Sequence, residues 1–72
     1  MAISYVLTED VHTVNRKRYI FYGIEAWEDG RPLLSFRDVS TDREGMEALV
    51  DDCNRLSLSP IHLCEVVEDF IG

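Results

Sequence analysis

The sequence is poor in several residue types, and each scarcity narrows what the protein can be. It holds two cysteines, two prolines and seven basic residues among 72, and no apolar run approaches the ~20 residues of a membrane-spanning helix. Met1 to Leu7 has neither the basic start nor the long apolar core of a signal peptide. We therefore expect a cytoplasmic protein in which Cys53 and Cys64, on the apolar faces of their helices, are buried and reduced thiols.

Basic residues are scarce mainly in the second half of the chain. Residues 1–39 carry six acidic and five basic side chains, whereas residues 40–72 carry eight acidic and two basic, within a net charge of −7. Binding to nucleic acid depends on clustered Lys and Arg, and an anionic membrane surface has the same requirement. The sequence therefore predicts neither a nucleic-acid partner nor a membrane partner.

Motifs for catalysis and for cofactor binding are also lacking. The four glycines are scattered, so there is no phosphate-binding loop, and no local motif places a nucleophile beside a base. The paired carboxylates at 51–52 and 68–69 fall on the polar faces of predicted helices. Cys53, His62 and Cys64 are close in sequence, but His62 and Cys64 would point about 200° apart on one helix. We expect no catalytic, cofactor or metal site.

His62 is the one titratable side chain that we single out as a candidate polar site. It is predicted to lie in the first turn of its helix, where the helix dipole disfavours the imidazolium form. A neutral imidazole in that position can act as an acid or a base. The competing interpretation is an exposed polar residue or a participant in helix capping.

Strand patterns fill the first half of the chain. Apolar and polar residues alternate over Ile3–Val11, aromatic and β-branched residues dominate Arg18–Glu28, and a third strand is predicted over Leu33–Val39. Residues 13–17 are predicted to connect the first two strands, and the Asp-Gly pair at 29–30 favours a tight turn before the third. An antiparallel three-stranded meander with the second strand in its centre is the simplest arrangement.

The predicted central strand carries large apolar groups on both of its faces. If helices cover only one face, the aromatic side chains of the other remain exposed and form a candidate interface, namely Tyr19, Phe21 and Trp27. Gly23, in the middle of this strand, predicts a bulge or the close approach of another segment.

Two amphipathic helices are predicted in the second half. One covers residues 42–56 and starts at a capping box formed by Thr41 and Glu44; the other covers residues 60–71, with Ser59 as its cap and Pro60 in its first turn. We therefore predict one α+β domain over residues 1–72, in which a β-meander is followed by two α-helices packed on the sheet (β-β-β-α-α) in two layers.

Three strings of residues carry a resemblance to a known group of proteins. They are DVSTDRE at 38–44, LSPIHL at 58–63 and VEDF at 67–70, and they follow YGIE at 22–25. With this order, size and acidity, the chain resembles a family of short uncharacterised proteins from clostridia and related Firmicutes. The resemblance implies a bacterial cytoplasmic protein and brings no activity, substrate or cofactor with it.

The function that fits these features best is a small protein-interaction or regulatory module without catalytic activity. Its partner would be another protein or a second copy of the chain, as a homodimer, bound through the aromatic strand face. The main alternative is an acidic mimic of nucleic acid that occupies a basic protein site with the carboxylates of the two helices. A small enzyme is the third class.

Overall fold

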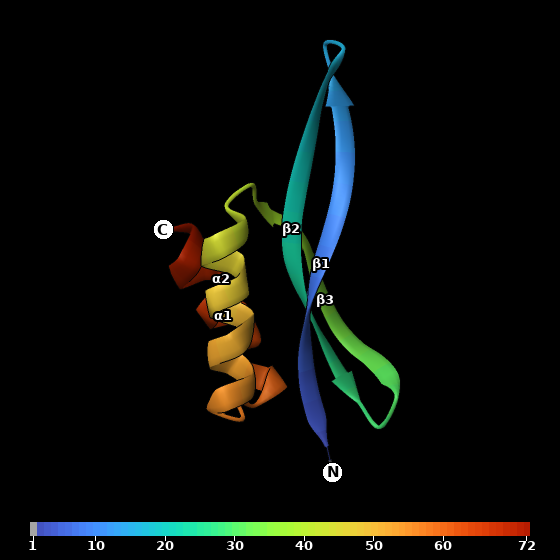
Figure 1. Ribbon diagram of the computed structural model, residues 1–72. Coiled ribbons are helices and arrows are strands. Elements are labelled where there is room, and N and C mark those ends of the chain that lie inside the picture. The colour runs from blue at the N-terminus through green and yellow to red at the C-terminus, as the bar shows by residue number, and fades with distance from the viewer. Residues whose placement is uncertain (1) are drawn as a thin grey trace.

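The computed structural model describes residues 2–72 and has the predicted β-β-β-α-α order of an α+β fold (Figure 1). The strands are antiparallel in the order β1-β2-β3, so β2 is the central strand. A short 3-10 turn precedes the second helix. The elements are β1 (Ile3–Val14), β2 (Lys17–Glu28), β3 (Arg31–Ser40), α1 (Arg43–Arg55), the 3-10 turn η1 (Pro60–His62) and α2 (Leu63–Ile71).

Both hairpins close with two-residue turns. Asp29 and Gly30 have φ angles of 49° and 80°, which confirms the predicted tight turn. At the other hairpin the predicted connection over residues 13–17 is too long, because Val14 still pairs with Lys17. Asn15 (φ 50°) and Arg16 (φ 65°) alone reverse the chain. Asn tolerates this left-handed conformation, so two residues are enough to close the hairpin and a longer loop is unnecessary.

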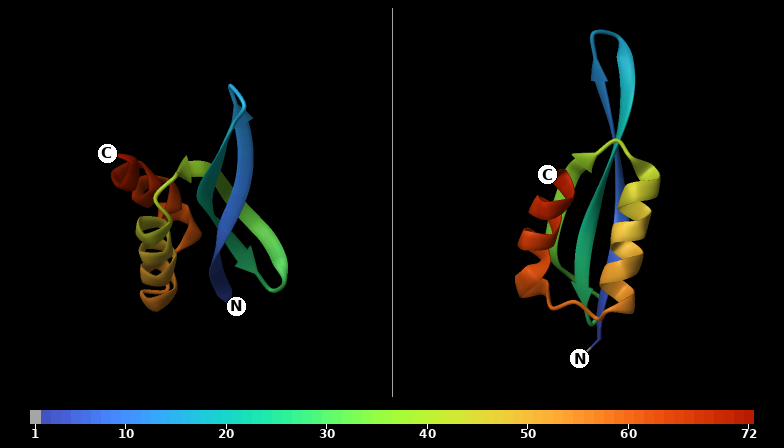
Figure 2. Two further views of the ribbon diagram at one scale, coloured as in Figure 1. Left: turned by 45° about the horizontal axis from the view of Figure 1, so that its top comes forward. Right: turned by 90° about the vertical axis from the view of Figure 1, so that its left-hand side faces the viewer.

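The outer part of the β1–β2 hairpin extends past both helices (Figures 1 and 2). We call this part, residues 10–21, the arm. Val11 and Ile20 lie directly opposite each other on the helix side of the arm, and their side chains are 49% and 41% exposed. The arm therefore carries apolar residues that no element of the described chain covers.

Both helices lie on the same face of the sheet. Figure 2 shows α1 beside β1 and α2 beside β3, and α1 contacts β1 and β2 whereas α2 contacts β3. This arrangement decides which face of β2 is covered, since Tyr22, Ile24 and Ala26 point toward the helices and are buried. They form the core together with Tyr5, Met46, Val50, Cys53, Leu63 and Val67.

The start of α1 differs from the predicted capping box. Asp42, and not Thr41, is the N-cap, and its carboxylate accepts a hydrogen bond from the Gly45 amide at 3.1 Å. The Asp42 amide in turn donates to Ser40 Oγ at 3.0 Å. A carboxylate at the cap accepts a hydrogen bond from a first-turn amide, and its negative charge is also stabilised by the positive end of the helix dipole. Asp42 is therefore a better cap than the Thr41 hydroxyl.

Gly23 allows two strands to approach closely, as its position in mid-strand predicts. A Cβ atom there would collide with the Phe36 carbonyl oxygen and would lie 2.6 Å from Thr8 Oγ1 and 2.9 Å from Arg37 Cα. The register of the β2–β3 ladder shifts at this point, between Tyr22 and Ile24. The shift carries Arg37 over the face of the sheet opposite the helices.

Candidate functional site

The face of the sheet opposite the helices, which we call the open face, carries the three predicted interface residues. Tyr19 is 41% exposed, and Phe21 and Trp27 are half-buried. All three share one side of β2, since alternate residues of a strand point to the same face. Their ladder partners on β1 are Ser4 for Trp27, Asp10 for Phe21 and His12 for Tyr19, and Trp27 also pairs with Pro32 of β3.

A chain of polar contacts crosses the open face from Trp27 to β1. Trp27 Nε1 donates to Glu25 Oε1 at 2.6 Å, and Glu25 Oε2 lies 3.8 Å from Arg37 Nη2. Arg37 Nη1 also donates to both carboxylate oxygens of Asp10, at 3.1 and 3.0 Å. The guanidinium of Arg37 on β3 thus joins carboxylates on β1 and β2. The carboxylate on β2, that of Glu25, also fixes the indole ring of Trp27.

The second aromatic residue of the open face, Phe21, has its own polar neighbour. The rings of His12 and Phe21 meet edge to face, with 5.3 Å between their centroids. His12 Nε2 is 3.0 Å from Asp38 Oδ1, and Asp38 has a left-handed φ of 56°. The irregular backbone of β3 therefore places a carboxylate where it holds the imidazole against the aromatic ring.

The aromatic residues of the open face were predicted from the sequence, whereas its ionic residues were not. Asp10 and His12 stand on the polar side of the predicted first strand, and that alternation was the only available signal. Their partners Arg37 and Asp38 come from the part of β3 opposite Gly23, between Phe36 and Ser40, where the register shifts. Alternation with a period of two determines which face of the sheet a residue points to, but it does not determine which residues of the next strand lie beside it.

His62 lies apart from the open face. It ends the 3-10 turn η1 and is the N-cap of α2 without a side-chain capping bond, so α2 begins one residue after it and not at Pro60. Its side chain is 58% exposed, and its Nδ1 atom is 4.0 Å from Glu65 Oε2. This geometry describes a solvated residue beside one carboxylate at the surface.

The two cysteines have different surroundings, which corrects the prediction that both are buried. Cys53 is buried in the core, whereas Cys64 is exposed on α2 and its Sγ atom lies 3.5 Å from Glu68 Oε1. Burial raises the pKa of the Cys53 thiol, and the hydrogen bond with the Glu68 carboxylate raises the pKa of Cys64. A raised pKa disfavours the thiolate, so neither side chain is an activated nucleophile.

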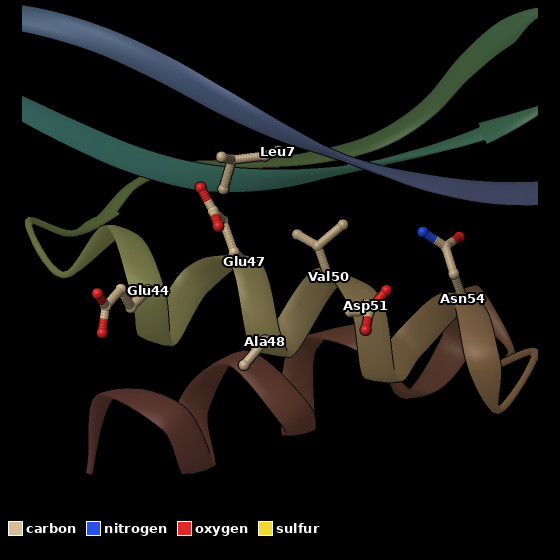
Figure 3. A pocket seen from close by; sticks show the side chains of 7 residues that line it. All are labelled: Leu7, Glu44, Glu47, Ala48, Val50, Asp51 and Asn54. Carbon is tan, nitrogen blue, oxygen red and sulfur yellow. The ribbon is translucent and has the colours of Figure 1, made fainter.

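A groove between α1 and the outer edge of β1 is the second surface of interest. It has a volume of about 420 Å³. Glu47, Val50 and Asn54 point from α1 toward the strands, and Leu7 faces them from β1 (Figure 3). We call it the acidic groove, and its lining residues are Leu7, Glu44, Glu47, Ala48, Val50, Asp51 and Asn54.

Asn54 closes one end of the acidic groove by binding the edge of β1. Its Nδ2 atom donates to the Tyr5 carbonyl oxygen and its Oδ1 atom accepts from the Tyr5 amide, both at 2.8 Å. From the sequence, Glu47 and Asp51 were expected on a solvated helix face and Glu44 in a capping box. Only the packing of α1 beside a free strand edge turns that face into the wall of a groove.

Among residues 2–72, no three His, Cys, Asp or Glu side chains are grouped as a metal site would require. Over the same range, no helix has the length and apolarity needed to cross a membrane.

Comparison with known proteins identifies one family. Searches of curated proteins and of solved structures returned no match. A family model described as a family of unknown function, DUF6514, matches residues 1–72. The chain therefore belongs to the DUF6514 family.

Proposed function

We propose that the protein is a small interaction module without catalytic activity, and that it binds a protein partner through the open face. The observation that carries this proposal is the placement of both helices on one side of the sheet. On the side opposite the helices (Figure 2), Tyr19 is exposed and Phe21 and Trp27 are half-buried. Aromatic side chains and Arg are the residues that most often dominate the binding energy of protein interfaces.

The polar contacts of the open face support the same proposal. Arg37 lies between the carboxylates of Asp10 and Glu25, and Glu25 in turn holds the Trp27 indole, so Trp27 loses little rotamer freedom when a partner binds. A rigid aromatic surface with paired charges suits a partner whose contact patch is mostly apolar. Such an interface is nearly indifferent to salt, because charge attraction contributes little to it.

We place this function in the bacterial cytoplasm. The family resemblance of the sequence implies a bacterial source, and both cysteines are free thiols. Cys64 is exposed, and an exposed thiol persists where the surroundings are reducing. A regulatory role, in which the module blocks or recruits its partner, fits a chain of this size.

Affinity capture from a lysate of the native host tests the proposal. Tagged wild-type protein is compared with Trp27→Ala and with a Phe21→Ala variant, and the bound proteins are identified by mass spectrometry after washing at low and high salt. We expect one partner to survive the high-salt wash and to be lost with either variant. Ile61→Ala is the matched control, because Ile61 is an apolar residue that is 77% exposed outside the open face. A partner that both aromatic variants retain would exclude the open face.

The acidic groove favours one alternative function, the mimicry of nucleic acid. Glu44, Glu47 and Asp51 lie around one concave surface that a basic protein segment can enter. This alternative predicts a partner that is lost at high salt and on reversal of Asp51 and Asp52 to Lys, while Trp27→Ala leaves it bound. The two functions thus respond in opposite ways to the same set of variants and washes.

A further inference from the structure

We propose that two copies of the chain pair through the free edge of β1 in the arm, so that the basic hairpin turn of each copy lies in the acidic groove of the other. This dimer uses a surface different from the open face, and it goes beyond the proposed function.

The outer edge of β1 offers unpaired backbone groups. Alternate residues of an antiparallel edge strand direct their amide and carbonyl groups away from the neighbouring strand. Tyr5 is one of these, since its amide and carbonyl groups bind Asn54 and not β2. The residues of the same parity further along β1 are Leu7, Glu9, Val11 and Thr13. Their outward backbone groups form a template on which another strand can pair.

Side-chain chemistry favours a register centred on Val11 for antiparallel pairing of β1 with itself. Centring the pair on Glu9 or on Asp10 places two like charges directly opposite each other, which is destabilising. Centring it on Val11 places Val11 against its own copy and Glu9 opposite Thr13. On the open face the same register sets Asp10 of each copy opposite His12 of the other.

This register also covers the apolar residues that the arm leaves exposed. Val11 and Ile20 are paired on the helix side of the arm and are 49% and 41% exposed. At the two-fold axis, both pairs come together and form an apolar cluster of four side chains. Asn54 limits the new ladder, because it already occupies the backbone groups of Tyr5.

The hairpin turn of each copy then reaches the acidic groove of the other. With Val11 at the axis, Asn15 of one copy stands opposite Leu7 of the second copy, and Leu7 lines the groove. Arg16, Lys17 and Arg18 follow directly, and they are three of the seven basic residues of the chain. Arg18 points to the helix side of the sheet, as Ile20 does. A basic turn thus meets the wall formed by Glu44, Glu47 and Asp51, in which Glu47 also binds Arg43 Nε at 2.6 Å.

Such a dimer has a two-fold axis perpendicular to the sheet, so both helix layers lie on one side and both open faces on the other. The four arm strands continue from one copy into the next as β2-β1-β1-β2. Two copies of Phe21 and Trp27 are then presented in a fixed relation. A partner with two matching sites would gain avidity from this arrangement.

Analytical ultracentrifugation of the purified protein tests the dimer directly. We expect the wild type to sediment at twice the 8.3 kDa of the chain. Val11→Pro removes an outward amide, so it spares the ladder with β2 and is expected to abolish dimerisation. Val11→Thr keeps the amide and the β-branched shape, and it is the matched control for the backbone bond. A wild type that stays monomeric at millimolar concentration, or a dimeric Val11→Pro variant, overturns the proposal.

A charge exchange tests the contact between the turn and the groove. Arg18→Glu and Glu47→Lys are each expected to weaken dimerisation by about tenfold, and the double variant is expected to recover most of that loss. Arg31→Glu, at the opposite hairpin, and Glu65→Lys, on α2, are the matched controls and should leave the dimer unchanged. Equal weakening by the control variants, or no recovery in the double variant, overturns the predicted register.

The two proposals fail independently of each other. Trp27→Ala lies outside the paired arm and is expected to dimerise as the wild type does, whatever it captures from a lysate. A monomeric wild type that still loses its partner with Trp27→Ala would remove the dimer and keep the open-face function.

Discussion

The side-chain amide of Asn54 on α1 binds both backbone polar groups of Tyr5 on β1, with each hydrogen bond at 2.8 Å. The Tyr5 hydroxyl donates to the Leu58 carbonyl oxygen at 2.5 Å, so this one strand residue is tied to α1 and to the segment after it. A side-chain amide carries an N–H donor and a carbonyl acceptor side by side, so it can pair with the carbonyl and the amide of one strand residue at the same time. Asn54 therefore fixes the helix layer on the sheet and ends the free edge of β1.

Replacing Asn54 by Ala is expected to lower the free energy of unfolding by about 1–3 kcal/mol, because the backbone groups of Tyr5 lose both partners in a partly buried place. Urea unfolding followed by Trp27 fluorescence measures the effect. Asn54→Asp retains an acceptor for the Tyr5 amide but sets a carboxylate against the carbonyl oxygen, so it should not rescue the loss. An unchanged unfolding midpoint in Asn54→Ala would contradict the role given to this residue.

The two candidate caps of α1 predict different effects of substitution. Asp42→Ala is expected to cost about 1 kcal/mol of stability, since the Gly45 amide loses its acceptor. Thr41→Ala is the control, because Thr41 is not the cap, and it should change stability by less than about 0.5 kcal/mol. Thermal unfolding followed by circular dichroism separates the two. A larger loss with Thr41→Ala would restore the capping box predicted from the sequence.

The two thiols are expected to react with Ellman's reagent in separate phases. Cys64 is exposed and should react in the folded protein, whereas Cys53 is buried and should react only after unfolding. Glu68→Gln should speed the reaction of Cys64, because the carboxylate raises the pKa of this thiol and so lowers its thiolate fraction. Cys64→Ser should remove the fast phase and leave the slow one. Simultaneous reaction of both thiols in the native wild type would contradict the burial of Cys53.

Stability is expected to fall in alkaline solution. Burial, and then the nearby Cys53, raises the pKa of Tyr5 above 10.0, and burial, followed by the charge of Asp52, raises that of Cys53 above 9.0. The folded state therefore holds both protons more tightly than the unfolded chain does. Their contribution is complete below about pH 9 and is lost as the pH rises through and beyond 10.

Urea midpoints measured at intervals between pH 8 and pH 11 check this expectation. Tyr5→Phe should reduce stability at neutral pH through the lost bond to Leu58, and it should flatten the decline above pH 10. A decline of the same steepness in Tyr5→Phe and in the wild type would assign the alkaline loss to other groups.

Much of the fold is predictable because it depends on local patterns. Alternation along β1 and β2, the Asp-Gly turn at 29–30 and the apolar spacing of the helices are properties of neighbouring residues, and each led to the correct element. The errors have local causes as well. Asn15 and Arg16 close a hairpin without a loop, and Asp42 caps α1 one residue after the Thr that was predicted. Alternative caps and turns differ by about 1 kcal/mol, so short patterns do not separate them.

The sequence by itself determined the order of the elements, the aromatic character of β2 and the uneven charge of the two halves, because those follow from residue type and spacing. Tertiary structure alone decided which face of β2 stays open, which carboxylates surround Arg37, and that Asn54 meets Tyr5. Those features join residues from separate strands and helices. Their pairing depends on the shifted register at Gly23 and on the side of the sheet that both helices cover, and neither is encoded in a local pattern.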